Sequence, residues 1–180
     1  MNIKENLLRM KDTTELMLDL AYSAVFLKDR QIAARVREMN KEITLLEDST
    51  MMMLFRIKEP EEERLFIIDL TDSIKDVANA AMHIAELAES KVAHPIVKDI
   101  LSESSRMVIA AKISHKSIYA NKTIGESKIR TTTRAFIIGI KRDGNWLFDI
   151  DKNTKLLPND EVIAVGRYEA DKLFKKNASG

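Results

Sequence analysis

The sequence contains no cysteine, which excludes disulfide bonds, thiol catalysis and cysteine-ligated zinc or iron–sulfur centres. It also lacks a long apolar run. The longest, near residues 51–55, falls far short of the roughly 20 residues that a membrane-spanning helix needs. Neither an HExxH nor a GxSxG pattern is present, and the N-terminal residues lack the apolar core of a signal peptide. We therefore expect a cytoplasmic protein that is not an enzyme.

Glycine is scarce and unevenly placed, because none of the five glycines precedes Gly125. The first two-thirds of the chain can therefore be continuous helix, whereas the last third must turn repeatedly, as a small sheet does. Charge divides in the same way. Residues 1–106 hold 15 Lys and Arg against 20 Asp and Glu, and residues 107–180 hold 14 against 8. The sequence thus predicts two domains, 1–106 and 107–180.

Apolar residues recur at helical spacing through the first domain. They predict three helices, separated by a turn near Lys28 and by the acidic segment around Pro60, with the third ending near Pro95. A shorter helix is expected over residues 95–106. The third helix carries a seam at 3-4 spacing, formed by Ile67, Leu70, Ile74, Val77, Ala81, Ile84 and Ala88. Long helices joined by short turns predict an antiparallel bundle with this seam in its core.

After residue 107 the apolar period changes to that of strands. We expect strands at residues 108–114, 117–119, 134–142, 145–148 and 161–166, a short helix from about Thr123, and a C-terminal helix over residues 169–175. Asp143 and Gly144 form a dipeptide typical of a β-hairpin. The order β-β-α-β-β-β-α makes a small α+β domain. The fold class is therefore mixed, with a helical bundle followed by an α+β domain.

Two helices carry acidic residues beside their apolar seams, four positions apart. Glu15 and Asp19 lie on the first helix, and Asp72 and Asp76 lie on the third. Like charges at this spacing repel by a few tenths of a kcal/mol, so they are either tolerated on a solvated edge or serve a purpose. If the two stripes face each other, their oxygens could hold a divalent cation or an iron centre, with His83 as a further ligand. The solvated edge and the metal site both remain open.

Residues 11–25 and 67–81 resemble the opening segments of PhoU-type helical repeats. PhoU proteins carry (E/D)xxxD motifs on facing helices that bind metal clusters, and they act in phosphate-uptake regulation. Glu15 with Asp19 and Asp72 with Asp76 fit those motifs. The chain has one three-helix unit where full PhoU proteins have two, so a second copy would complete the assembly. The resemblance implies metal binding by these four carboxylates, with phosphate-linked regulation as an alternative function.

Residues 107–176 resemble the TrkA-C domain, the C-terminal half of the RCK regulators of potassium channels and transporters. The matching segments, in the family's order and spacing, are residues 121–126, 137–142, the turn at 143–144, and 157–166. The resemblance implies a homodimer with a pocket for a regulatory ligand near its interface, to which Ile129 and Arg130 correspond. Some members bind a cyclic dinucleotide there. Residues 133–136 depart from the family's pattern, and Phe136 offers no amide group, which argues against that ligand and leaves another small anion open.

The glycine distribution also excludes the domain that usually precedes TrkA-C. RCK proteins place a Rossmann half with a GxGxxG loop there, and with no glycine before Gly125 this chain has no such NAD or ATP site. A PhoU-like bundle in its place resembles archaeal proteins related to potassium transport. We therefore expect a dimeric regulatory subunit, peripheral to a potassium or other cation transporter. Nucleic-acid binding by the basic half is less favoured, because few aromatic residues accompany its charges.

Overall fold

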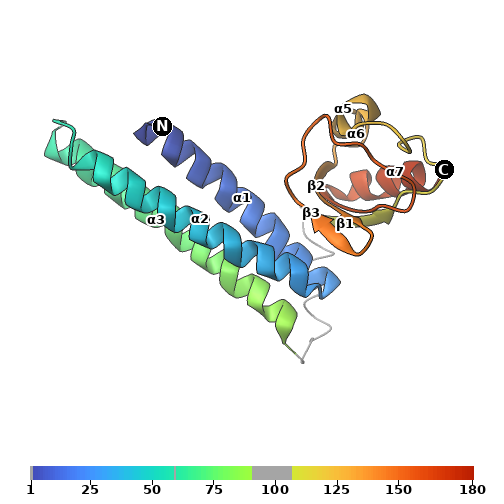
Figure 1. Cartoon of the computed structure of the whole chain (residues 1–180), viewed down its shortest axis with the longest axis horizontal. Coiled ribbons are helices and arrows are strands. Elements are labelled where there is room, and N and C mark those ends of the chain that lie inside the picture. Colours follow the sequence, from blue (N-terminus) through green and yellow to red (C-terminus); the bar gives the residue numbers. More distant parts are fainter. Residues whose placement is uncertain (1, 59, 91–106) are drawn as a thin grey trace. The chain divides into compact units, whose positions relative to one another are not determined.

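The computed structural model describes residues 2–58, 60–90 and 107–180. The chain divides into two compact units, with the division between residues 91 and 92 (Figure 1). The predicted domain boundary, at residues 106 and 107, adjoins the stretch outside the described residues and stays a prediction. None of the helices in the described part of the chain is both long and apolar enough to cross a bilayer.

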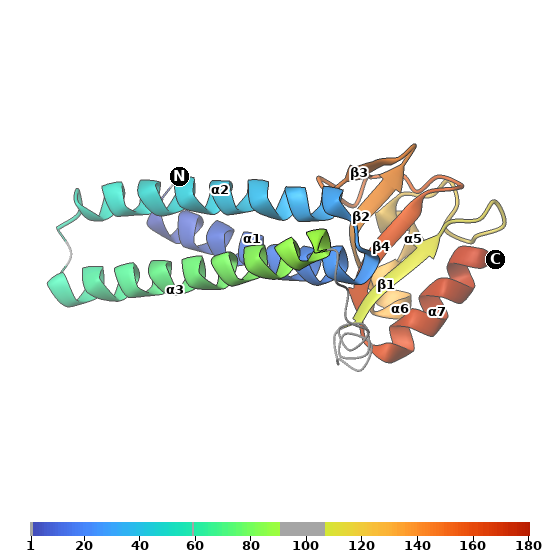
Figure 2. The ribbon, with the colours of Figure 1, turned by 90° about the horizontal axis from the view of Figure 1, so that it is seen from below.

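The first unit is an antiparallel bundle of three long helices. They are α1 (Ile3–Leu27), α2 (Arg30–Leu54) and α3 (Glu61–Glu86), and α3 continues into the short 3-10 helix η1 (Leu87–Glu89). Each long helix packs against the other two along the bundle (Figures 1 and 2). The predicted helical bundle is thus confirmed.

The turns between these helices follow from local sequence. Lys28 ends α1 in the left-handed conformation, with φ 54°. The Asp29 side chain then accepts hydrogen bonds from the first backbone N–H groups of α2, at Gln31 and Ile32. Pro60 precedes α3, whose first turn is acidic and so complements the positive end of the helix dipole.

Two predictions about α3 are wrong. The helix was expected to end near Pro95, but it ends at Glu86, with η1 continuing only to Glu89; the expected helix over residues 95–106 lies outside the described residues. The predicted seam is also only partly buried, because Leu70 is 38% exposed and Val77 is 43% exposed. The buried positions are instead small residues, namely Thr71, Ala78, Ala81, Ala85 and Ala88.

The second unit is a four-stranded antiparallel sheet with helices on one face. The strands are β1 (Met107–Lys112), β2 (Phe136–Arg142), β3 (Asn145–Leu147) and β4 (Glu161–Gly166), in the order β1-β4-β2-β3. The helices are α5 (Ile124–Ser127), α6 (Ile129–Thr133) and α7 (Tyr168–Ser179). The mixed fold is confirmed, and α6 is a helix that the sequence reading missed.

The core of this unit lies between the sheet and α6 and α7. Apolar side chains from β1, β2 and β4 meet Ile129 of α6 and Phe174 of α7, and Phe174 stacks on Tyr119 with ring centroids 5.9 Å apart. The predicted strand at 117–119 is wrong, because this segment is a turn that anchors Tyr119. The Ser117 hydroxyl accepts a hydrogen bond from the Tyr119 N–H at 3.1 Å, and donates one to the Asn177 carbonyl at 2.8 Å.

Two glycines have structural roles in the sheet, Gly144 in the turn between β2 and β3 and Gly139 within β2. Asp143 and Gly144 both have positive φ, 50° and 83°, as a two-residue type I′ hairpin between β2 and β3 requires. Gly139 lies at a register shift between β2 and β4, where an added Cβ would come within 3.0 Å of the Ile163 side chain and 3.1 Å of the Phe148 ring. The turn at Asp143 and Gly144 confirms the predicted hairpin.

Candidate functional site

The predicted metal ligands of the bundle do not form a cluster in the part of the chain that the structure describes. No group of three or more His, Asp or Glu side chains is arranged there to hold a metal ion. Glu15 is exposed and pairs with Lys11 on its own helix at 2.9 Å. Asp72 and Asp76 are exposed, whereas Asp19 is buried. Metal binding by these four residues stays a prediction that requires ligands from elsewhere, such as a second copy.

His83, the further candidate ligand, is also exposed. Its Nδ1 lies 3.3 Å from the carboxylate of Glu86, one turn along the same helix. This contact is an ordinary pair on a helix surface. It gives no indication of a ligand site at His83 within one chain.

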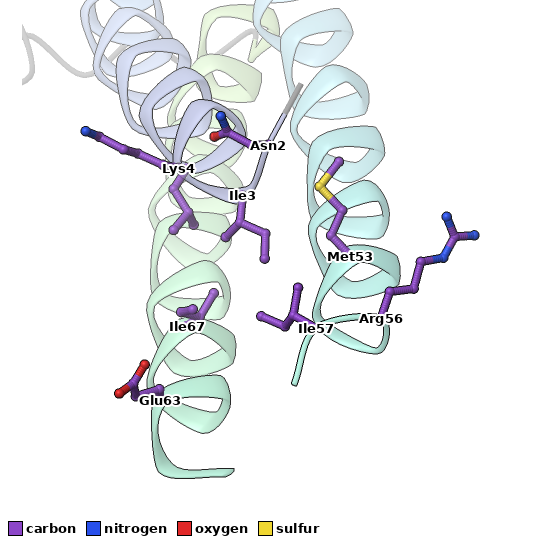
Figure 3. Close-up of a pocket in the computed structure, with 9 residues that line it drawn as sticks. Asn2, Ile3, Lys4, Met53, Arg56, Ile57, Glu63 and Ile67 are labelled. Atoms are coloured by element: carbon purple, nitrogen blue, oxygen red, sulfur yellow. The ribbon is translucent and has the colours of Figure 1, made fainter. Parts of the chain in front are cut away.

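A cavity of about 720 Å³ opens at the end of the bundle where α1 begins and the α2–α3 turn lies (Figure 3). Its lining residues are Asn2, Ile3, Lys4, Leu7, Met53, Arg56, Ile57, Glu63 and Ile67. Figure 3 shows the apolar side chains of Ile3, Met53 and Ile57 turned toward the opening, with the charged ends of Lys4 and Arg56 directed away from it. The cavity therefore offers apolar contact area rather than ligating groups.

The second unit carries a surface with exposed charged residues around α6. This helix is a single turn, bracketed by Lys128 and Arg134, which both have left-handed backbones with φ 50° and 60°. The Thr133 hydroxyl holds the backbone that leaves α6, because it donates a hydrogen bond to the Ile129 carbonyl at 2.7 Å and accepts one from the Ala135 N–H at 3.1 Å. Left-handed conformations cost non-glycine residues about 1–2 kcal/mol each, so the surrounding contacts hold this turn in place.

The two residues implied by the TrkA-C resemblance have different positions. Ile129 is buried in the core beneath α6, so its side chain anchors the helix. Arg130 is exposed, and its guanidinium lies 5.7 Å from the centre of the Phe136 ring, as in a cation–π contact. Phe136, at the start of β2, is itself 50% exposed. Of the two, Arg130 is the one whose side chain can meet a ligand.

Three cations lie in or next to α6, and one of them, Arg130, contacts this exposed ring. We call Lys128, Arg130, Arg134 and Phe136 the α6 patch. All four are exposed. Among the described residues, none of the three cations forms an ion pair with a carboxylate. Guanidinium and ammonium groups bind phosphate oxygens, and an exposed ring can stack on a planar group. The sequence reading missed Lys128 and Arg134, although three basic residues within seven positions would have indicated them.

The strongest ion pair of this unit is structural. Asp160 is buried, and it accepts two hydrogen bonds from the Arg142 guanidinium, at 2.9 and 2.8 Å, and one from the Leu157 N–H at 2.7 Å. Arg142 also donates to the Lys155 carbonyl at 2.8 Å. The hydrogen bond with Asp160 raises the pKa of Arg142 above its ordinary value. The pair joins β2 to the segment that precedes β4.

Comparison with known domains agrees with the two-part architecture. A PhoU domain model matches residues 7–90, and a TrkA-C domain model matches residues 108–176. The chain combines a PhoU domain with a TrkA-C domain. Both predicted resemblances are thereby confirmed, and the α6 patch belongs to the TrkA-C domain. No curated protein matches the chain.

Solved structures resemble parts or most of the chain. One is the RCK_C domain dimer of BusR from S. agalactiae in complex with c-di-AMP, at 21% identity over 39% of this chain and 92% of that chain, with a TM-score of 0.37. Another is the RCK C domain of the potassium transport protein KtrA in complex with c-di-AMP, at 25% identity over 44% and 88%, with a TM-score of 0.38. S. agalactiae BusR in complex with its busAB-promotor DNA matches at 16% identity over 92% and 95%, with a TM-score of 0.38. TM-scores of this size carry no argument about ligand or partner.

Proposed function

We propose that the protein is a regulatory subunit, without catalytic activity, that controls a potassium or other cation transporter. In this proposal it acts as a homodimer at the cytoplasmic side of the membrane, and its TrkA-C domain binds a small anionic ligand through the α6 patch. The domain assignment supports a regulatory role, since TrkA-C domains belong to regulators of potassium transport. The observation that carries the ligand proposal is the set of three exposed cations at α6, one of which, Arg130, contacts the exposed ring of Phe136.

The α6 patch suits a ligand that has both negative charge and a planar group. Lys128 and Arg134 lie at the two ends of a one-turn helix, so their charges can meet separate phosphate or carboxylate groups of one small molecule. Phe136 and Arg130 already lie in contact, which presents a flat surface beside the charges. The strained turn at α6 is a conformation that a bound ligand could stabilise or release. A ligand that prefers one of two arrangements of the dimer shifts their populations and thereby changes the subunit's effect on its transporter.

A thermal-shift screen of the full chain tests this proposal, because any specific ligand raises the unfolding midpoint by linkage. The screen includes nucleotides, cyclic dinucleotides, inorganic phosphate and divalent cations. We expect an anionic ligand to stabilise the protein and Arg130→Met to weaken its binding by about 10- to 100-fold, measured by calorimetry, since a hydrogen bond to a charged group contributes about 1.5–3 kcal/mol. Met keeps much of the length of the side chain but removes the charge.

Lys141→Met is the matched control. Lys141 lies over the Trp146 ring at 5.5 Å, which is a similar cation–aromatic contact at the other end of β2, five residues from Phe136. This variant should bind the ligand as the unmodified protein does. Unchanged binding by Arg130→Met would refute the α6 patch as the site. Stabilisation by divalent cations alone would favour the alternative function, a metal-binding PhoU domain in phosphate-linked regulation.

A further inference from the structure

Helix α3, together with η1 at its end, carries two apolar seams. Only one of these seams packs inside the bundle. The inner seam packs against α1 and α2 and consists of Ile67, Thr71, Ile74, Ala78, Ala81, Ala85 and Ala88. The outer seam precedes it by one residue throughout and consists of Phe66, Leu70, Ser73, Val77, Ala80, Ile84 and Leu87. On the outer seam, Phe66 is 68% exposed and Leu87 is 59% exposed. Ile84 is half-buried, and the other members of this seam are exposed.

The spacing of the outer seam is that of a helix that packs on another helix. Its members follow one another at intervals of 4, 3, 4, 3, 4 and 3 residues, which is the pattern of a two-helix seam, kept over three heptads. Ser73 and Ala80 are small, so they permit a second helix to approach closely. The Ser73 hydroxyl donates to the Asp69 carbonyl at 2.7 Å and therefore needs no partner in an apolar contact. An exposed apolar stripe of this length indicates an interaction surface rather than a solvated face.

The side-chain sizes along the outer seam fit a second copy of the same helix. With the helices antiparallel and the two-fold axis between Ala78 and Asn79, the four contacts nearest the axis place a large side chain level with a small one, and the outer contacts pair two leucines. Val77 is level with Ala80 of the second copy, Ile84 with Ser73, and Leu70 with Leu87. A two-fold contact repeats each of these pairs, as a self-complementary interface requires.

Charges beside the outer seam also fit this arrangement. Asp76 and His83 lie beside the outer seam, on the side away from the inner seam, and both are exposed. In the antiparallel pair, Asp76 of one copy lies near His83 of the other, and symmetry makes this contact twice. A carboxylate and an imidazole can share a hydrogen bond in either protonation state of the ring. A parallel pair would instead place Asp76 opposite the inner seam of the other helix, which is apolar, so charge complementarity favours the antiparallel arrangement.

We propose that the outer seam of α3 is an interface for a second copy of this chain, paired antiparallel about a two-fold axis near residues 78 and 79. The interface lies in the PhoU domain and goes beyond the proposed function, since it depends on neither ligand binding nor the TrkA-C domain. The surface of α3 would then be covered without any other protein.

Disulfide trapping in the full chain tests the pairing cleanly, because the chain has no cysteine of its own. Ser73 and Ile84 are roughly 16 Å apart along one helix, so cysteines at both positions cannot join within a chain, which needs Cα atoms within about 7 Å. In the proposed dimer each lies level with the other residue of the second copy. We expect Ser73→Cys/Ile84→Cys to give a covalent dimer under mild oxidation, whereas each single variant stays a monomer on a non-reducing gel.

The controls separate the possible arrangements. Asp72→Cys lies on the same helix but away from the outer seam, and it should give no covalent dimer. Covalent dimers from the single variant Ser73→Cys would show a parallel pair and overturn the proposal. Absence of any dimer from the double variant, in protein whose circular dichroism shows a folded bundle, would overturn it as well and leave the seam to another partner. Ligand binding by the α6 patch is measured separately, so failure of either proposal leaves the other intact.

Discussion

The buried pair of Asp160 and Arg142 allows a quantitative test of what stabilises the TrkA-C domain. Asp160 is 2% exposed and accepts three hydrogen bonds, two from Arg142 and one from the backbone N–H of Leu157. Asp160→Ala removes all three and leaves the guanidinium, whose side chain is 30% exposed, without its counter-charge. Removing one partner of such a buried pair typically costs about 3–5 kcal/mol, against about 0–1 kcal/mol for a surface pair.

That loss is comparable to the whole stability of the domain. A unit of the length of residues 107–180 has a free energy of unfolding of roughly 4–11 kcal/mol. Asp160→Ala should therefore leave the domain marginally folded at 25 °C. The double variant Arg142→Met/Asp160→Leu should recover most of the loss, because apolar residues of similar volume need no counter-charge or hydrogen-bond partners.

Trp146 makes the measurement specific to this domain. It is the single tryptophan of the chain and lies in β3, so its fluorescence during urea unfolding reports the TrkA-C domain alone. Circular dichroism at 222 nm follows mainly the long helices of the bundle and serves as the control, which Asp160→Ala should leave unchanged. A loss below about 1 kcal/mol in the Trp146 transition would refute the reasoning, since it would mean that the pair acts as an exposed one.

Two further predictions use the same fluorescence assay. Hydrogen bonds from the backbone N–H and hydroxyl of Thr123 hold the pKa of Glu126 below its ordinary value of 4.5. The resulting stability is fully present above that value and is lost as pH falls through the lower folded pKa. We expect Glu126→Gln, which keeps the capping geometry, to show a smaller loss of stability below pH 4.5 than the unmodified protein; equal losses would contradict this. Gly139→Ala should cost about 1–3 kcal/mol, because its Cβ would press on Phe148. Gly144→Ala, with open space but a φ of 83°, should cost only about 1 kcal/mol, and a larger loss at Gly144 than at Gly139 would reverse the reasoning.

Local signals predicted those elements whose chemistry is complete within a few residues. Asp143 with Gly144 specifies a type I′ turn, and Thr123 with Glu126 forms the capping box that starts α5. Helix α6 has no such signal, because Lys128 and Arg134 adopt left-handed conformations that their residue types do not favour. Tertiary packing of Ile129 holds that turn, so a reading of the sequence alone could not find it.

The candidate site was predictable only in part for the same reason. A position in a family pattern pointed equally to Ile129 and Arg130, but burial assigns the first to the core and leaves the second exposed. The acidic pairs of the bundle illustrate a further limit. Spacing places Asp72 and Asp76 on one face of α3, but it carries no information on which helix that face meets. Within one chain these carboxylates remain exposed, which the sequence could not decide.

Helix α3 shows why periodicity did not identify its buried face. The predicted seam combined Ile67, Ile74, Ala81 and Ala88 of the inner seam with Leu70, Val77 and Ile84 of the outer one, since both seams repeat with the same 3-4 period. Which of the two seams is buried depends on the volume that the side chains of α1 and α2 leave in the core. Helices α1 and α2 fill the core with large residues such as Met10, Met17, Leu20, Met39 and Ile43. Close packing then leaves room for small residues of α3, so Ala78, Ala81 and Ala85 are buried in the core while Phe66, Leu70 and Val77 remain exposed. The three helices of the bundle therefore leave the larger apolar side chains on the surface of α3, and this surface is the one that we propose for a second copy of the chain.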